Sequence, residues 1–121
     1  VLMAKRVGGQ RAGWYGWIGG KLEFGETLQA CAQREAREEA GIDITRLRLL
    51  CLSTIIVDDQ HWGDVEFLAD IASGEPHTAA PAEIDGWFWY PIDQLPSPIF
   101  EPAQRALEAY RSGRLLNDEE T

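Results

Sequence analysis

Apolar and polar positions along the chain follow two different periods, and each period predicts a kind of element. Apolar residues at alternate or successive positions, bounded by Gly, Pro or Asp, predict strands. Strands are expected over residues 1–6, 47–57, 61–72 and 86–90. Apolar residues three and four positions apart predict helices, one between the first two strands and one after the last strand. Strands interleaved with helices predict a mixed α/β fold.

Two segments carry the start and stop signals of helices. Thr27 is a good N-cap and Gly41 is a natural C-terminal residue, so a helix is expected over residues 28–40. A second helix is expected over residues 101–112, with a Pro near its start and a Gly after its end. Residues 7–20 are rich in Gly and aromatic side chains, and this composition predicts a loop before the first helix.

The composition is that of a globular protein with an acidic surplus. Hydrophobic residues make up 45% of the chain and charged residues 26%, values that are typical of folded domains. Eleven basic against 20 acidic residues leave a net charge of −9, which argues against a nucleic-acid polymer or an anionic membrane as the partner. A small phosphorylated ligand is compatible with this charge if a divalent cation supplies the positive field.

The length predicts a single domain over residues 1–121, in which residues 114–121 form a loosely ordered acidic tail. No apolar run approaches the roughly 18 residues of a membrane span, and the start is no signal peptide, so a cytoplasmic location is expected. Cys31 and Cys51 have no metal-ligand or redox spacing. One disulfide between them is an alternative, but two reduced, buried thiols fit a cytoplasmic protein better.

The first helix places acidic residues on its apolar face. At 100° per residue, Leu28, Cys31 and Ala32 form the buried stripe, and Glu35 and Glu39 continue it within roughly 20° of its centre. Two carboxylates one turn apart repel each other, and burial raises the cost of their charge. The C-terminal end of a helix disfavours negative charge as well. Three unfavourable effects therefore coincide at these two residues.

Glu38 lies on one shoulder of this stripe, beside Arg34. Two interpretations of the glutamates follow. They form an ordinary solvated face of an amphipathic helix, or they hold a hard divalent cation such as Mg²⁺, which prefers oxygen ligands and shares its shell with phosphate. The coincidence of unfavourable effects favours the metal site, although it does not name a reaction.

Residues 20–42 resemble the signature of the Nudix hydrolases, Gly-x5-Glu-x7-Arg-Glu-U-x-Glu-Glu-x-Gly-U, in which U is a bulky aliphatic residue. The sequence matches the fixed positions at the correct spacing with Gly20, Glu26, Arg34, Glu35, Glu38, Glu39 and Gly41. Ala36 is smaller than the usual U residue, and Ile18 stands where proline is usual. The similarity covers almost the whole chain, and residues 86–91 resemble the closing strand of MutT-like nucleotide pyrophosphatases.

The resemblance implies an α/β/α sandwich with a mixed β-sheet between helices, and a strand before Val1 that this sequence lacks. It implies Mg²⁺ as the cofactor, with Mn²⁺ as an alternative, held by Glu35, Glu38, Glu39, the Gly19 carbonyl and Glu83. Glu35, Glu39 and Glu38 are also the candidate catalytic residues, with Glu35 the first choice as general base and Glu39 the second. Structural roles within the signature fall to Gly20, Glu26, Arg34 and Gly41, and the Glu26–Arg34 pair is expected to brace the loop against the helix.

Residues that bind substrate are expected outside the signature. Arg6, at the end of the first strand, resembles a phosphate-contacting arginine of MutT-like relatives. Trp62 and Trp14 are candidates for a wall against the nucleobase. The other tryptophans are expected to pack in the core: Trp17, Trp87 and Trp89.

The resemblance implies Mg²⁺-dependent hydrolysis of a nucleoside triphosphate, with an oxidised or non-standard nucleotide as a candidate, to a monophosphate and pyrophosphate. One alternative is the same chemistry on ADP-ribose, NADH or a nucleotide sugar. The sequence lacks the extra residues that usually form a larger second pocket, which favours a triphosphate. Another alternative is a nucleotide-binding module without catalysis, against which the intact glutamates argue. A homodimer is common among similar proteins and is one expected assembly.

Overall fold

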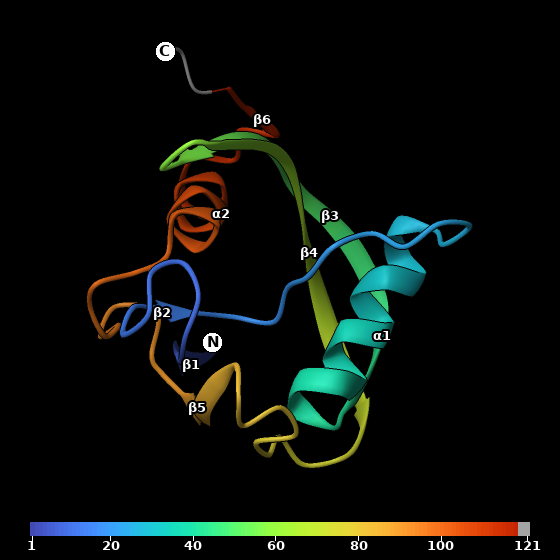
Figure 1. The fold of residues 1–121 in the computed structure, drawn as a ribbon. Coiled ribbons are helices and arrows are strands. Elements are labelled where there is room, and N and C mark those ends of the chain that lie inside the picture. Colours follow the sequence, from blue (N-terminus) through green and yellow to red (C-terminus); the bar gives the residue numbers. More distant parts are fainter. Residues whose placement is uncertain (119–121) are drawn as a thin grey trace.

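A computed structural model describes residues 1–118 and consists of two helices and six strands (Figure 1). In chain order these elements are β1 (Leu2–Arg6), β2 (Tyr15–Gly16), α1 (Leu28–Ala40), β3 (Asp43–Val57), β4 (Gln60–Ser73), β5 (Ile84–Trp89), α2 (Glu101–Ser112) and β6 (Leu116–Asn117). The predicted α/β class is confirmed. Both helices have the predicted bounds, whereas β3 begins four residues earlier than the apolar pattern predicts.

The strands form two three-stranded sheets, ordered β2-β1-β5 and β4-β3-β6. The first sheet is antiparallel, with Met3 opposite Phe88. The second is mixed, because β3 and β4 form a long antiparallel hairpin while β6 runs parallel to β3. Figure 1 shows this hairpin curving past both helices, with β1, β2 and β5 gathered at the other side of the molecule. The expected mixed sheet is thus present, and a separate antiparallel sheet accompanies it.

Local chemistry explains both ends of α1. The Oγ1 atom of Thr27 accepts a hydrogen bond from the Ala30 N–H at 3.1 Å, which satisfies one of the donors that a helix start leaves open. Gly41 has a φ of 66°, a left-handed conformation that glycine adopts without steric cost. Its N–H closes the last turn on the Ala36 and Arg37 carbonyls.

The core divides into two clusters that fix the two helices. One cluster packs Ala36 and Ala40 of α1, with Ile42 just after it, against Ala4 of β1 and Ile84 and Trp87 of β5. The other packs Ala106 and Ala109 of α2 against Cys51 of β3, with Trp17 and Leu50 partly buried beside them. Small alanine side chains face the sheets in both helices, so each helix packs close to its strands. Within the described part of the chain, Cys31 and Cys51 are buried, free thiols, as predicted.

Three features differ from the sequence-based expectations. Leu28 is 48% exposed because α1 is held through its later turns, where Ala36 and Ala40 are buried. Trp89 is 61% exposed at the end of β5. Leu116–Asn117 pairs with β3, and Asn117 is buried, where a loose tail was expected; the rest of that tail, residues 119–121, lies outside the described residues. None of the helices in the described chain is long and apolar enough to cross a bilayer.

Candidate active site

Glu39 is a buried acid on the inner face of α1. Its side chain has a relative exposure of only 6%, and burial raises its pKa from 4.5 to about 9, with Glu35 as the second cause. One oxygen, Oε2, accepts a hydrogen bond from the Gly19 N–H at 3.4 Å. The indole of Trp87 on β5 donates to the Glu39 carbonyl at 2.9 Å. The backbone and side chain of Glu39 are therefore both held in place by other elements.

Glu35 lies one helical turn before Glu39, and the two carboxyl groups interact. The loop backbone comes close to Glu35 at Gly20, where a Cβ atom would lie 2.1 Å from the Glu35 Cδ. Only glycine therefore fits at this position without displacing the carboxylate. The helix face that carries Glu35 and the loop at residues 19–20 therefore lie in close contact.

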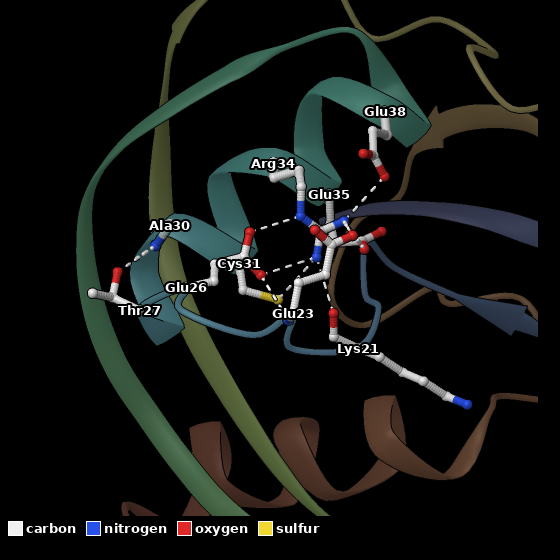
Figure 2. A network of polar contacts seen from close by, with 9 residues as sticks. All are labelled: Lys21, Glu23, Glu26, Thr27, Ala30, Cys31, Arg34, Glu35 and Glu38. Atoms are coloured by element: carbon white, nitrogen blue, oxygen red, sulfur yellow. Dashed lines mark hydrogen bonds and ion pairs between the residues drawn. The ribbon is translucent and has the colours of Figure 1, made fainter.

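Arg34 is the centre of a network that ties the loop to α1 (Figure 2). Its guanidinium donates to both oxygens of Glu26, at 2.7 and 3.1 Å, and to the Lys21 carbonyl at 2.9 Å. Hydrogen bonding to Arg34 is the main cause that lowers the pKa of Glu26 to about 2. The predicted contact between Glu26 and Arg34 is present as a bidentate pair, the geometry in which arginine binds a carboxylate most specifically.

The same guanidinium also holds Glu35 and Glu38. Arg34 Nη1 lies 2.6 Å from Glu35 Oε1 and 3.2 Å from Glu38 Oε2. Figure 2 shows Glu35 and Glu38 approaching Arg34 from the helix. Among the hydrogen bonds of residues 1–118, Arg34 donates to Glu35 and not to Glu39. The arginine therefore orients one member of the Glu35–Glu39 pair, while the buried member accepts from the Gly19 N–H.

Glu38 does not join the other two glutamates. Its side chain is 57% exposed, because residue 38 is turned about 100° from residue 39 around the helix axis. Across residues 1–118, no group of three or more His, Cys, Asp or Glu side chains converges as a metal cage. The three predicted glutamates are therefore divided: Glu35 and Glu39 face the site, and Glu38 lies on its outer flank beside Arg34.

The paired carboxyls fit a cation. The buried Glu39 carboxyl lies beside the Glu35 carboxyl, and no cationic side chain within residues 1–118 hydrogen-bonds to Glu39. Burial first, and Glu35 second, raise the pKa of Glu39. A divalent cation with oxygen ligands would offset both burial and mutual repulsion. Glu83 adds a further negative charge near Glu39. The close approach of Gly20 leaves backbone polar groups of the loop beside the carboxyls.

These acids open into a cavity of about 1660 Å³ lined by both helices, by β1, β4 and β5, and by the segment before α1. Among the predicted residues, Arg6, Gly19, Glu35, Glu39, Trp62 and Glu83 line it. The volume exceeds the roughly 300–1,000 Å³ of common small-molecule sites. An extended ligand therefore fits in this space.

Arg6 brings positive charge to the cavity at the end of β1. Its guanidinium stacks over the Phe100 ring at 3.8 Å from the centroid and donates through Nε to the Gln10 carbonyl at 3.0 Å. Burial lowers its pKa, and the charges of nearby Glu39 and Glu83 partly oppose that effect. The Val7 N–H donates to the Glu83 carbonyl at 2.8 Å, which holds the Glu83 loop beside this arginine.

Trp14 does not lie where it could form the predicted wall against a nucleobase in the cavity. The Arg11 guanidinium lies 5.0 Å from its ring centroid, and Trp14 is absent from the described residues that line the cavity. Arg11 is itself paired with Glu101 at 3.0 Å. The aromatic side chain is therefore used in a surface stack between loop and helix, whereas Trp62 does line the cavity.

Asp64 and Glu66 on β4 are cavity residues that the sequence did not single out. Burial is the first cause of a raised pKa for both carboxyl groups. Trp17 Nε1 donates to Glu66 Oε2 at 3.2 Å. The alternation of Trp62, Asp64 and Glu66 along a predicted strand was the available signal, but it does not show which face of the strand points inward.

Comparison with known proteins agrees with this architecture. The NUDIX domain model matches residues 1–110. A NAD-capped RNA hydrolase NudC of Vibrio atlanticus (strain LGP32) is 34% identical over 107 residues, which are 81% of this chain and 36% of that protein. NudC of Haemophilus influenzae (strain PittEE) is 37% identical over 109 residues, 84% of this chain and 38% of that protein. The chain thus spans little more than a third of the length of these relatives.

A solved structure of similar size matches the fold as well. The MutT NUDIX hydrolase from Burkholderia pseudomallei superposes with a TM-score of 0.85 and 34% identity, covering 89% of this chain and 85% of that one. The NUDIX domain of Shewanella oneidensis NrtR, at 18% identity, shares the fold, with a TM-score of 0.73, and covers 93% of this chain and 75% of that one. With its signature residues placed between the loop and α1, the chain belongs to the NUDIX family of hydrolases.

Proposed function

We propose that this chain hydrolyses a nucleoside triphosphate to a nucleoside monophosphate and pyrophosphate, using Mg²⁺ or Mn²⁺. The observation that carries the proposal is the buried Glu39 beside Glu35, at the edge of a cavity large enough for a nucleotide. An unfavourable carboxyl pair of this kind serves a purpose if it binds a cation during the reaction. The similarity to a MutT NUDIX hydrolase over 89% of this chain supports a hydrolase of this family.

Glu35 and Glu39 would hold the cation, and Glu83 and the Gly19 carbonyl are further candidate ligands. Glu38 would contribute to cation binding only from the outer flank of the site, because its side chain is directed toward Arg34. When bound, the cation neutralises phosphate oxygens and lowers the pKa of a bound water. Cation binding also favours the ionised form of Glu39, which burial alone disfavours.

The remaining steps follow from the protein's own side chains. Arg6 binds the phosphate oxygens, since its stacked guanidinium lies at the cavity wall. Glu35 accepts the proton of the attacking water, with Glu39 as the second candidate for this role. The water oxygen forms a bond to one phosphorus of the α–β anhydride while the bridging P–O bond to that phosphorus breaks, and the electron pair leaves with the other product, pyrophosphate or the nucleoside monophosphate.

A dinucleotide such as NADH, or ADP-ribose, is the second candidate substrate class. The names of the NudC relatives favour it, because those proteins are named as hydrolases of NAD-capped RNA. The cavity volume is also larger than a mononucleotide needs. The net charge of −9 argues against tight binding of the polymer part of such an RNA by this chain.

The test is a turnover panel with matched variants. Canonical and 8-oxo triphosphates, NADH and ADP-ribose are incubated with the protein and Mg²⁺, and monophosphates and pyrophosphate are quantified. Pyrophosphate from triphosphates supports the proposal; monophosphates from NADH or ADP-ribose alone support the second class. Glu39→Gln should abolish either activity, while Glu108→Gln, an exposed carboxylate on α2, should retain it. Binding without turnover of any compound would contradict both enzymatic proposals.

A further inference from the structure

The segment between β4 and β5 closes the C-terminal end of α1. Residues 74–79, which we call the strap, leave β4 and pass the last turn of the helix (Figure 1). A helix leaves the carbonyls of its last turn without partners inside the helix. The His77 N–H donates to the Ala40 carbonyl at 3.0 Å, and the Ala79 N–H donates to the Glu39 carbonyl at 3.2 Å. The strap therefore caps the turn that carries Glu39.

Two glycines bring the strap and the helix end into direct contact. A Cβ atom at Gly74, where φ is 92°, would lie 2.8 Å from the Gly41 carbonyl oxygen. A Cβ atom at Gly41 would overlap the His77 ring. The strap backbone therefore lies against the Gly41 backbone at one point, and the imidazole lies on Gly41 at another. A connection that merely spans two strands has no need of contacts this close.

His77 is an exposed residue, so burial in the core does not explain its position. Its Nδ1 atom lies 3.1 Å from the Glu75 carbonyl oxygen within the strap, while its ring lies on Gly41 at the helix end. The imidazole thus links the strap to α1. His77 is not among the described residues that line the cavity, so any effect that it has on the site passes through the residues it contacts.

The strap fixes the backbone of an acid whose side chain is weakly held. The Glu39 carbonyl accepts two hydrogen bonds, from the Ala79 N–H at 3.2 Å and from the Trp87 indole at 2.9 Å. The Glu39 carboxyl itself accepts from the Gly19 N–H at 3.4 Å, which is long for a hydrogen bond. The backbone therefore carries much of the task of placing this carboxyl beside Glu35. Small displacements of a reacting group are costly to catalysis.

We propose that His77 is a positioning residue for the reaction: by packing on Gly41 it seats the strap, and the strap holds Glu39 where its carboxyl and that of Glu35 bind the cation. The inference rests on the proposed function, because it concerns the same pair of carboxyls. His77 supplies no ligand and no proton in this role. It acts only through Gly41 and the strap backbone.

The test measures cation binding as well as turnover. Binding of Mn²⁺ to the full chain is followed by electron paramagnetic resonance of the free ion, without substrate. His77→Ala should weaken Mn²⁺ binding about tenfold and lower kcat by a similar factor, with KM changed by less than about twofold. His77→Phe keeps a flat ring over Gly41 and should restore both values. Thr78→Ala, which removes a neighbouring exposed side chain of the strap, is the matched control and should match the wild type.

A double-mutant cycle tests the contact between His77 and Gly41. Gly41→Ala places a methyl group against the ring and also strains the backbone at φ 66°. The strain is common to both backgrounds and cancels in the cycle. The loss of Mn²⁺ affinity caused by Gly41→Ala should be about threefold or more smaller when residue 77 is already alanine, the scale of coupling between contacting residues.

Urea unfolding of each variant separates positioning from stability. If Gly41→Ala does not fold, the His77→Ala and His77→Phe pair still decides the question. A His77→Ala variant that loses stability but keeps its Mn²⁺ affinity and kcat would overturn the inference, because the histidine would then be structural only. So would a His77→Phe variant no better than His77→Ala, or additive effects in the cycle.

Failure of this inference and of the proposed function are distinguishable. Mn²⁺ affinity that depends on His77, without hydrolysis of any triphosphate, would uphold the positioning role and contradict the proposed reaction. Hydrolysis of triphosphates with kcat and Mn²⁺ affinity unchanged in His77→Ala would uphold the reaction and overturn the positioning role. A wild-type chain that binds no Mn²⁺ would overturn both.

Discussion

Replacing Glu39 by Gln tests the central feature of the site. In the folded protein without metal, Glu39 has a pKa of about 9, against 4.5 for an ordinary glutamate. Folding therefore takes up a proton at any pH between these values, and the free energy of unfolding falls as the pH rises through that window. One pKa unit is worth 1.36 kcal/mol, so the cost to the folded state reaches about 3 kcal/mol at pH 7. The Gln variant keeps the size and polarity but does not titrate.

The assay is urea unfolding by tryptophan fluorescence in EDTA, from pH 4.5 to 8.5, for wild type and variant. Wild type and variant should be nearly equal in stability at pH 4.5. At pH 7 the variant should be more stable by about 3 kcal/mol, because only the wild type must keep the residue 39 carboxyl protonated in order to fold. Adding Mg²⁺ should stabilise the wild type and leave the variant nearly unchanged. Turnover by the variant should fall by orders of magnitude.

Two results would refute this reasoning. Parallel stability curves across the pH window would show that Glu39 is not held as a buried acid. A stable variant with wild-type turnover would remove Glu39 from the mechanism. Glu108 is an exposed carboxylate on α2, so the stability curve of Glu108→Gln is the control for replacing a surface glutamate.

Other substitutions test the loop and the helix around this acid. Gly20→Ala should reduce kcat at least about tenfold, because its Cβ would displace the Glu35 carboxylate; unchanged kcat would contradict the close approach. Arg34→Lys should lower both melting temperature and kcat, since lysine cannot reproduce the bidentate pair with Glu26, and thermal unfolding with turnover measures both. Thr27→Ala should lower the free energy of unfolding by about 1 kcal/mol through loss of the N-cap, without changing KM.

Sequence reasoning succeeded where a few neighbouring residues decide the structure. Thr27 and Gly41 bound α1 as predicted, because capping uses atoms within one turn of the helix end. The contact between Glu26 and Arg34 was implied by the resemblance to the Nudix signature, and the structure contains it. The placement of Glu35 and Glu39 on one face followed from helical geometry alone.

The remaining features depend on partners that are distant in sequence. Leu28 belongs to the apolar stripe, yet it is 48% exposed, because α1 packs through its later turns, where Ala36 and Ala40 are buried. Asp64 and Glu66 have an alternation that fits either face of β4, and only the packing of the hairpin against the rest of the domain decides which face is inward.

The hydrogen bond from the Trp87 indole to the Glu39 carbonyl connects a residue of the buried core to the candidate active site. A core tryptophan here sets the position of the backbone that carries an acid of the site, with no intervening side chain. A substitution of Trp87 that is made to raise the melting temperature therefore also moves the backbone of Glu39. Stability and catalytic activity cannot be changed independently at Trp87.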